Sequence, residues 1–128
     1  MNNIFKNNEE KFNYFLPALT DQKFDHFQKL EIRLGLEKDI DINIHSDAKF
    51  NYAQIEKIRE GLEEELDVSM YADPEFDAEQ MEQIRLGLEE GLDVSTYTNS
   101  KFNIGQMWKI RHDLGKEINK NINSNSKF

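Results

Sequence analysis

Carboxylates are the most numerous side chains in this sequence that could do chemistry. The chain has 128 residues, with 25 Asp and Glu against 16 Lys and Arg, and a formal net charge of −9. Two carboxyl groups can divide acid and base roles when their surroundings drive their pKa values apart. Here the acidic positions instead recur from one copy of a repeated segment to the next, which is typical of a solvated helix face. No Gly-rich phosphate loop, nucleophile motif or cysteine accompanies them, so we expect a protein that is not an enzyme and needs no cofactor.

Potential metal ligands are present but do not form a recognisable site. Residues 39–43 read Asp-Ile-Asp-Ile-Asn and imitate the start of an EF-hand calcium loop. Ile44 stands where that loop needs Gly, and Phe50 stands where it needs Glu, so calcium binding is not expected. The three histidines occupy unrelated positions of the repeat: His26, His45 and His112. Because a metal site needs ligands that converge, the sequence predicts none.

The repeated segment has a period of 26 residues and occurs four times. Phe recurs at positions 24, 50, 76, 102 and 128, Gln at 28, 54, 80 and 106, and Arg at 33, 59, 85 and 111. A fixed short period is the sequence mark of a repeat protein, in which each unit buries its apolar face on the next.

Each repeat opens with a helix-start signal, an Asx residue followed three residues later by Gln. The pairs are Asp25/Gln28, Asn51/Gln54, Asp77/Gln80 and Asn103/Gln106. In a capping box of this kind each side chain serves the backbone N–H of the other residue. We expect helices that begin near residues 25, 51, 77 and 103 and run for ~14 residues, the length over which the apolar positions keep a helical spacing.

Apolar residues then step by three, four and four positions along each predicted helix. This pattern predicts that Ile58, Leu62, Ile84 and Leu88 are buried. Glycine recurs in the middle of the helices at 35, 61 and 87, where it costs about 1 kcal/mol relative to Ala, so a neighbouring segment is expected to approach closely.

The segment after each helix is too short for a second full helix. Asp67 is expected to cap a single helical turn whose Val68 and Tyr71 face inward. The fold class that follows is all-α, a small α-solenoid of four repeats, each one α-helix plus a short helical turn.

The ends of the chain differ from the repeat. Residues 1–23 are expected to form an N-terminal cap, with a short helix that is capped by Asn8 and ends near Pro17. Residues 24–122 then hold the four-repeat helical solenoid, and residues 123–128 form a weakly ordered C-terminal tail. No apolar run reaches the roughly 20 residues of a membrane span, and the N-terminus is polar. Together with the lack of cysteine, this indicates a cytoplasmic protein.

The repeat resembles a known kind of short helical repeat. Residues 80–95, with residues 71–76, are similar to the short helical repeats of uncharacterised proteins from phages and mobile elements of low-GC bacteria. The architecture also resembles the leucine-rich variant repeat, which alternates an α-helix with a short 3₁₀ helix. The resemblance covers residues 24–122, carries no activity with it, and implies a solenoid in the cytoplasm of a bacterial host.

The acidic residues of the middle repeats form the candidate binding site. Residues 50–75 carry eight acids and two bases, residues 76–101 carry six and two, and residues 102–127 carry two and five. Helical spacing places the acids in a row across adjacent helices, and we expect this row to be solvated. The candidate partner-binding residues are Glu56, Glu60, Glu63, Glu64, Glu82, Glu89 and Glu90, together with Trp108.

Two other features allow two interpretations each. Trp108, the only Trp, is either an exposed anchor at the basic end of the acidic row or packs under the tail from Asn119. The arginines at 33, 59, 85 and 111 either bind a partner or pair with the junction residues Asp41, Asp67 and Asp93 and so bridge the repeats.

These observations favour a non-enzymatic protein-binding module. An acidic middle repels phosphates, so direct nucleic-acid binding is not expected, whereas a protein partner with a basic surface is. By analogy, the chain is expected to be a phage or mobile-element inhibitor of a bacterial defence nuclease, of the anti-CRISPR or antirestriction type, that imitates nucleic acid. The alternative is a structural solenoid whose ends stack into a homo-oligomer.

Overall fold

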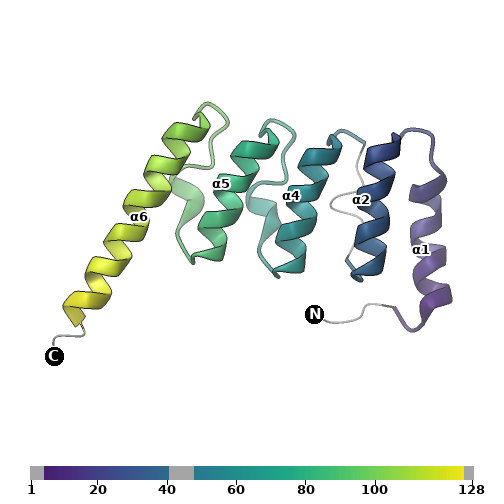
Figure 1. Ribbon diagram of the computed structural model, residues 1–128, viewed down its shortest axis with the longest axis horizontal. Helices are drawn as coiled ribbons and strands as arrows, with labels where there is room; N and C mark the ends of the chain where they lie inside the picture. The colour runs from purple at the N-terminus through teal and green to yellow at the C-terminus, as the bar shows by residue number, and fades with distance from the viewer. Residues whose placement is uncertain (1–4, 41–47, 126–128) are drawn as a thin grey trace.

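The chain is a single row of helices packed side by side in chain order, and each helix contacts the next (Figure 1). The computed structural model describes residues 5–40 and 48–125, and in those ranges every regular element is helical. The α-helices are α1 (Asn8–Thr20), α2 (His26–Glu37), α4 (Tyr52–Glu63), α5 (Ala78–Glu89) and α6 (Ile104–Asn125). Two 3₁₀ turns follow α4 and α5: η1 (Val68–Met70) and η2 (Val94–Thr96). The all-helical prediction is confirmed.

The predicted helix starts are also confirmed. Asp25, Asn51 and Asp77 are the N-cap residues of α2, α4 and α5, and each forms the full capping box with the Gln three residues on. At the start of α6, the Asn103 backbone donates to Gln106 Oε1 at 2.9 Å and the Gln106 backbone donates to Asn103 Oδ1 at 2.8 Å.

The capping glutamines have a second role that links consecutive helices. Gln28 Nε2 donates to the carbonyl of Phe50 at 2.6 Å, Gln54 Nε2 to that of Phe76 at 2.6 Å, and Gln80 Nε2 to that of Phe102 at 2.7 Å. All three glutamines are buried. Each glutamine side chain therefore caps the N-terminus of its own helix and also holds the backbone just before the next helix.

Gln54→Ala should lower the free energy of unfolding by about 1–3 kcal/mol, because it leaves the Asn51 N–H and the Phe76 carbonyl without their buried partner. Gln106→Ala is the matched control, since Gln106 is exposed and, among the described residues, bonds only within its own helix cap. It should cost no more than about 1 kcal/mol. Urea unfolding followed by circular dichroism measures both, and equal losses would contradict the linking role.

Helices α2, α4 and α5 end earlier than expected, after 12 residues rather than ~14. The residue after each C-cap has a left-handed backbone, with φ of 57° at Asp39, 60° at Glu65 and 74° at Gly91. This conformation turns the chain back on the helix, so that the backbone N–H of the following residue, Leu66, donates to the Gly61 carbonyl at 2.9 Å, as in a Schellman motif. Leu66 and its counterpart Leu92 therefore lie beyond the helix and close its end.

Helix α6 lacks this ending and runs for 22 residues, to Asn125. Asp113 stands where α4 and α5 have their middle glycine, and Lys120 and Asn123 stand where the 3₁₀ turns have Val and Tyr. Without an apolar turn to fold back against it, the helix continues. The expected tail is thus helical as far as Asn125, while residues 126–128 lie outside the described residues.

The glycines of α4 and α5 are needed because the 3₁₀ turns pack directly on the helices. Tyr71 Oη donates to the Lys57 carbonyl at 2.7 Å, and Tyr97 Oη donates to the Gln83 carbonyl at 2.9 Å. A Cβ placed on Gly61 would lie 2.1 Å from the Tyr71 hydroxyl, and one on Gly87 would lie 1.9 Å from that of Tyr97. The expected close approach is confirmed, and it comes from the turn that Asp67 caps through Ser69 N–H.

Gly87→Ala should therefore destabilise the protein by about 1–3 kcal/mol, because the added methyl group displaces the buried Tyr97 ring. Gly115→Ala, in α6, is the matched control: its nearest neighbour would be a carboxylate oxygen of Glu90 at 3.9 Å. That variant should gain up to about 1 kcal/mol in helix propensity. Thermal melts of the two variants should shift in opposite directions, and a stabilised Gly87→Ala variant would contradict the packing argument.

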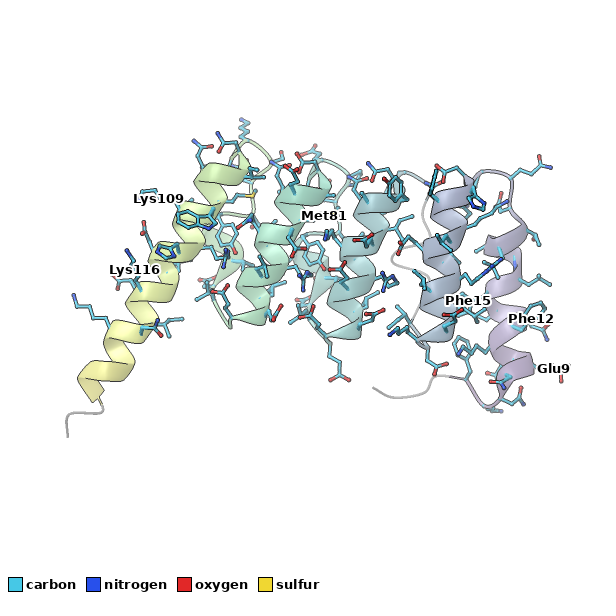
Figure 2. The ribbon with its side chains drawn as sticks, viewed as in Figure 1. Glu9, Phe12, Phe15, Met81, Lys109 and Lys116 are labelled. Carbon is cyan, nitrogen blue, oxygen red and sulfur yellow. The ribbon has the colours of Figure 1, made fainter. Side chains whose placement is uncertain are left out.

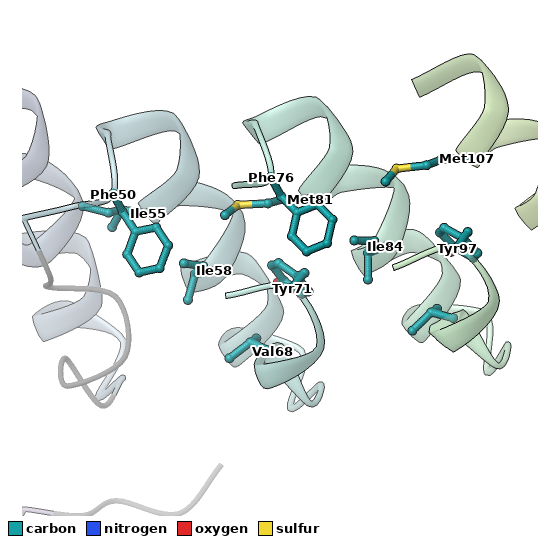
Figure 3. Close-up of a cluster of buried hydrophobic side chains, with 11 residues drawn as sticks. Phe50, Ile55, Ile58, Val68, Tyr71, Phe76, Met81, Ile84, Tyr97 and Met107 are labelled. Carbon is teal, nitrogen blue, oxygen red and sulfur yellow. The ribbon is translucent and has the colours of Figure 1, made fainter. Parts of the chain in front are cut away.

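The main core is a line of apolar side chains that runs across α4, α5 and α6 (Figure 3). Ile58 and Ile84 are fully buried, as predicted, whereas Leu62 and Leu88 are only partly buried. The 3₁₀ turns supply Val68, Tyr71, Val94 and Tyr97 to the same core.

A second core joins α1 to α2 and contains Phe5, Phe15, Phe24 and Ile32. Phe15 is fully buried on the side of α1 that faces α2, whereas Phe12 is half exposed and lines a hollow with Leu36 and Glu37 of α2 (Figure 2). The N-cap of α1 is Asn7 rather than Asn8, and the helix continues through Pro17 to Thr20. Packing of Ala18 and Leu19 against this core holds the last turn in spite of the proline.

Candidate functional site

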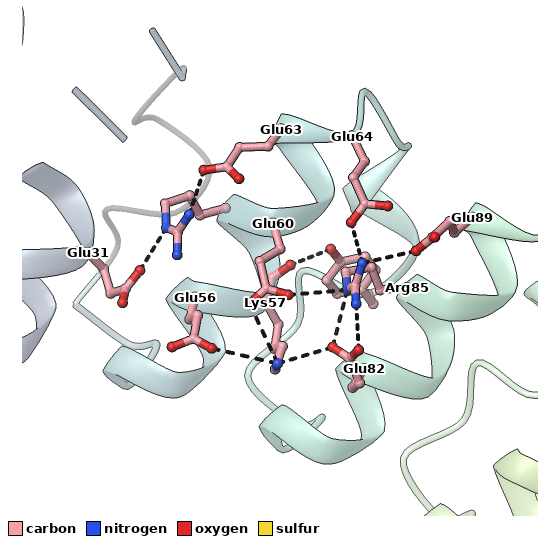
Figure 4. Close-up of polar contacts among 11 residues, drawn as sticks. Glu31, Glu56, Lys57, Glu60, Glu63, Glu64, Glu82, Arg85 and Glu89 are labelled. Carbon is pink, nitrogen blue, oxygen red and sulfur yellow. Dashed lines mark hydrogen bonds and ion pairs between the residues drawn. The ribbon is translucent and has the colours of Figure 1, made fainter. Parts of the chain in front are cut away.

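Arg85 lies at the centre of the acidic residues that the sequence selected. Its guanidinium forms ion pairs with carboxylates from two helices: Glu60 (3.5 Å) and Glu64 on α4 and at its end, and Glu82 (2.5 Å) and Glu89 (3.2 Å) on α5 (Figure 4). Arg85 is only 8% exposed. A single buried cation therefore fixes four carboxylates relative to one another.

Lys57 is the second cation of this cluster. Its Nζ lies 3.7 Å from Glu56, 3.6 Å from Glu60 and 3.2 Å from Glu82 (Figure 4). The acidic cluster, as we call it, consists of Glu56, Lys57, Glu60, Glu64, Glu82, Arg85 and Glu89. It holds five carboxylates against two cations, and its formal charge is negative by three.

Equivalent arginines repeat the arrangement in the neighbouring units. Arg59 pairs with Glu31 on the preceding helix at 2.8 Å and with Glu63 on its own helix at 2.5 Å. Arg111 pairs with Glu90 and donates to Gln83 Oε1 at 3.1 Å. Each arginine thus reaches back to the unit before it.

The predicted partners of these arginines were wrong. Asp67 and Asp93 do not meet a guanidinium; their carboxylates accept from the Ser69 and Ser95 backbones and cap the 3₁₀ turns. Their short side chains serve the nearest N–H groups, whereas glutamates on the helices are long enough to cross between units. Asp41 lies outside the described residues. The bridging interpretation itself agrees with the structure for residues 59, 85 and 111.

The expectation that the acidic row is simply solvated was also wrong. The side chain of Glu82 is 25% exposed and that of Glu60 27%, and both hold cations, whereas Glu89 is 52% exposed. Glu63 and Glu90 belong to the pairs with Arg59 and Arg111 rather than to the acidic cluster. Replacing the whole row by Lys would consequently disturb the contacts between the helices.

Burial and pairing shift the carboxyl pKa values in opposite directions within the acidic cluster. Burial raises the pKa of Glu60 despite the nearby Lys57 and Arg85, and burial with the Glu89 contact raises the pKa of Glu64. Burial also acts on Glu82, but hydrogen bonds from Arg85 and Lys57 outweigh it and lower the pKa of that carboxyl. Because the pKa of Glu82 is lower in the folded state, its charge stabilises the fold above the unfolded-state pKa, and this stabilisation is lost as the pH falls through the folded-state pKa. The pKa values of Glu60 and Glu64 are higher in the folded state, so their ionisation opposes folding.

Trp108 is exposed and is not packed under residues 119–125, while its role as an anchor stays a prediction. It is 49% exposed, and its ring stacks on His112 with centroids 4.8 Å apart and planes at 10°. Helix α6 continues straight past Asn119, so residues 119–125 do not fold back over it. His26 is also exposed, and His45 lies outside the described residues.

Lys57 was not predicted from the sequence, and Arg85 was predicted as a bridging residue without its glutamate partners, although a signal for those partners exists. Arg85 has glutamates three residues before it and four residues after it, the spacing at which side chains meet on one helix face. Among the described residues, no group of acids and histidines has metal-binding geometry, and no helix could cross a membrane.

Arg85→Met should lower the free energy of unfolding by about 2–3 kcal/mol at pH 7, because four carboxylates lose their shared cation. The loss should shrink as the pH falls to about 4, because protonation relieves the repulsion and Glu82 no longer has a cation that favours its charged form. Urea unfolding at both pH values measures this. Lys109→Met is the control: its pair with Asp113 is exposed and screened by water, so this variant should unfold like the parent at both pH values. A deficit that stays constant with pH would contradict the charge argument.

Comparisons with protein-family models, with curated proteins and with solved structures found no match to this chain.

Proposed function

We propose that the chain is a small α-solenoid of four repeats with an N-terminal capping helix, and that it acts as a non-enzymatic protein-binding module. Its acidic cluster would occupy a basic surface on the partner. The observation that carries the proposal is the excess of carboxylates that Arg85 fixes across α4 and α5.

The fixed geometry favours binding in two ways. Carboxylates already held by Arg85 and Lys57 lose little side-chain entropy when a partner arrives. The remaining negative charge extends beyond contact distance and raises the rate at which a positively charged surface meets this face. Both effects need several carboxylates together and depend weakly on any single one.

The partner we propose is a bacterial defence nuclease, whose nucleic-acid groove is basic. A lattice of carboxylates on adjacent helices, spaced ~8–10 Å apart by helix packing, imitates the charge of a phosphate backbone. The chain would then act as a phage or mobile-element inhibitor in the host cytoplasm. Support comes from the small size, the net charge of −9 and the rigid acidic cluster.

A second candidate function is structural. Phe12 and Leu16 are exposed apolar residues on α1, the helix at the N-terminal end of the row, so that end can contact another copy. Light scattering that shows concentration-dependent oligomers would favour this reading over inhibition by a monomer.

The immobilised chain should capture a nucleic-acid-binding protein from a low-GC bacterial lysate, and a DNA duplex of about 20 base pairs should release that protein. The double variant Glu56→Gln/Glu89→Gln should slow association with the captured protein about 3–10-fold at low salt, and salt should erase the difference. These two glutamates are the most exposed members of the acidic cluster, so Arg85 keeps its other partners.

The matched control is Glu9→Gln/Glu37→Gln, which removes the same charge from exposed positions at the N-terminal end of the row of helices. It should associate like the parent. Capture that DNA does not reverse, or equal association of the two double variants, would contradict the proposal.

A further inference from the structure

A shallow hollow lies beside the acidic cluster, at the beginning of α5 and α6. It is lined by Lys57, Ala78, Glu79, Glu82, Gln83 and Ile104. Two of these residues, Lys57 and Glu82, also belong to the acidic cluster. The hollow is therefore continuous with the charged surface described above.

The hollow lies where one helix begins with a small residue, Ala78. The first position of each helix in the repeat is occupied in turn by His26, Tyr52, Ala78 and Ile104. At α4 the Tyr52 ring lies 5.2 Å from the ring of Phe27 on α2, and the two aromatic rings cover the surface between those helices. At α5 the equivalent of Tyr52 is Ala78, which lines the hollow, and the equivalent of Phe27 is Ala53, so no aromatic pair stands at this junction.

The chemistry of the hollow combines an apolar wall with a carboxylate rim. Ala78 and Ile104 provide the wall, and Ile104 is 43% exposed although it is a large apolar residue. Lys57 and Glu82 already pair with each other, whereas Glu79 forms no ion pair among the residues that the structure describes. A ligand that suits both parts has an apolar side chain directly beside a cation.

We propose that this hollow anchors an apolar side chain of the partner protein, with an adjacent Lys or Arg of that partner paired to Glu79. This inference rests on the proposed function, since it adds a specific contact to the basic surface that the acidic cluster attracts. The acidic cluster sets the association rate, and the hollow slows dissociation, because a buried apolar anchor acts mainly on residence time. Nucleic acid does not fit here, because the rim carboxylates repel phosphate.

The test uses two synthetic peptides, acetyl-Arg-Leu-Arg-amide and acetyl-Arg-Ala-Arg-amide, titrated into the ¹⁵N-labelled full chain. The leucine peptide should shift the amide signals of Ala78, Glu79, Gln83 and Ile104, and should bind about tenfold more tightly than the alanine peptide. Equal affinity of the two peptides would overturn the proposal.

Three variants locate the binding. Ala78→Tyr places at α5 the residue that α4 carries at the same position, so the fold should accept it, and it should reduce the leucine peptide to the affinity of the alanine peptide. His26→Tyr introduces the same residue at the same position of α2 and should leave both affinities unchanged. Glu79→Gln should weaken both peptides alike and reduce their salt dependence. An Ala78→Tyr variant that keeps the preference for leucine would also overturn the proposal.

The outcomes separate this inference from the function on which it rests. If both peptides bind equally and salt weakens them, the acidic surface attracts cations and the hollow plays no part. If the hollow prefers leucine but no captured protein is released by DNA, the hollow binds as proposed and the imitation of nucleic acid is wrong.

Discussion

A buried glutamine amide is the interaction on which the arrangement of the helices depends. At Gln28, Gln54 and Gln80 the side-chain oxygen accepts from the helix's own N-cap, and the nitrogen donates to a carbonyl 22 residues further on. An unpaired amide in an apolar interior is costly, so both halves must be satisfied together. That requirement fixes where each helix begins relative to the one before it. The other contacts between units depend on this relative position of the helices.

The ion pairs between units follow from the same register. Because consecutive helices start level with each other, the arginine eight residues after each N-cap from the second repeat on lies beside the preceding helix and meets a glutamate there. Partly buried arginine is well suited to this place, since its planar group can hold several carboxylates at once. The acidic surface is therefore part of the packing between α4 and α5, and binding and stability share residues.

The features that recur in each repeat could be predicted from the sequence, whereas the partners of individual side chains could not. Capping boxes, the turn after each helix and the need for Gly61 and Gly87 follow from local rules that act within a few residues. The partners of Arg85 lie on two helices, and sequence alone does not show whether Asp67 or a glutamate reaches it. The length of α6 was missed for a similar reason: it depends on the absence of a turn that packs against it.

Comparison of the units with one another separates architecture from recognition. Gln, Phe and Arg stay the same at their positions in all four repeats, as the packing requires. The first position of each helix, in contrast, changes from His26 to Tyr52, Ala78 and Ile104, and the fifth changes from Leu30 to Glu56, Glu82 and Trp108. With the exception of Ala78, Glu56 and Glu82, these residues are exposed, and none of them belongs to the main core. Residues outside the apolar core can differ without loss of the fold. Among them, Glu56 and Glu82 belong to the acidic cluster, and Ala78, Glu82 and Ile104 line the hollow beside it. The surface formed by the first turns of the helices is thus the part of the chain where residues differ between repeats without a structural reason, as expected for a surface that recognises a partner.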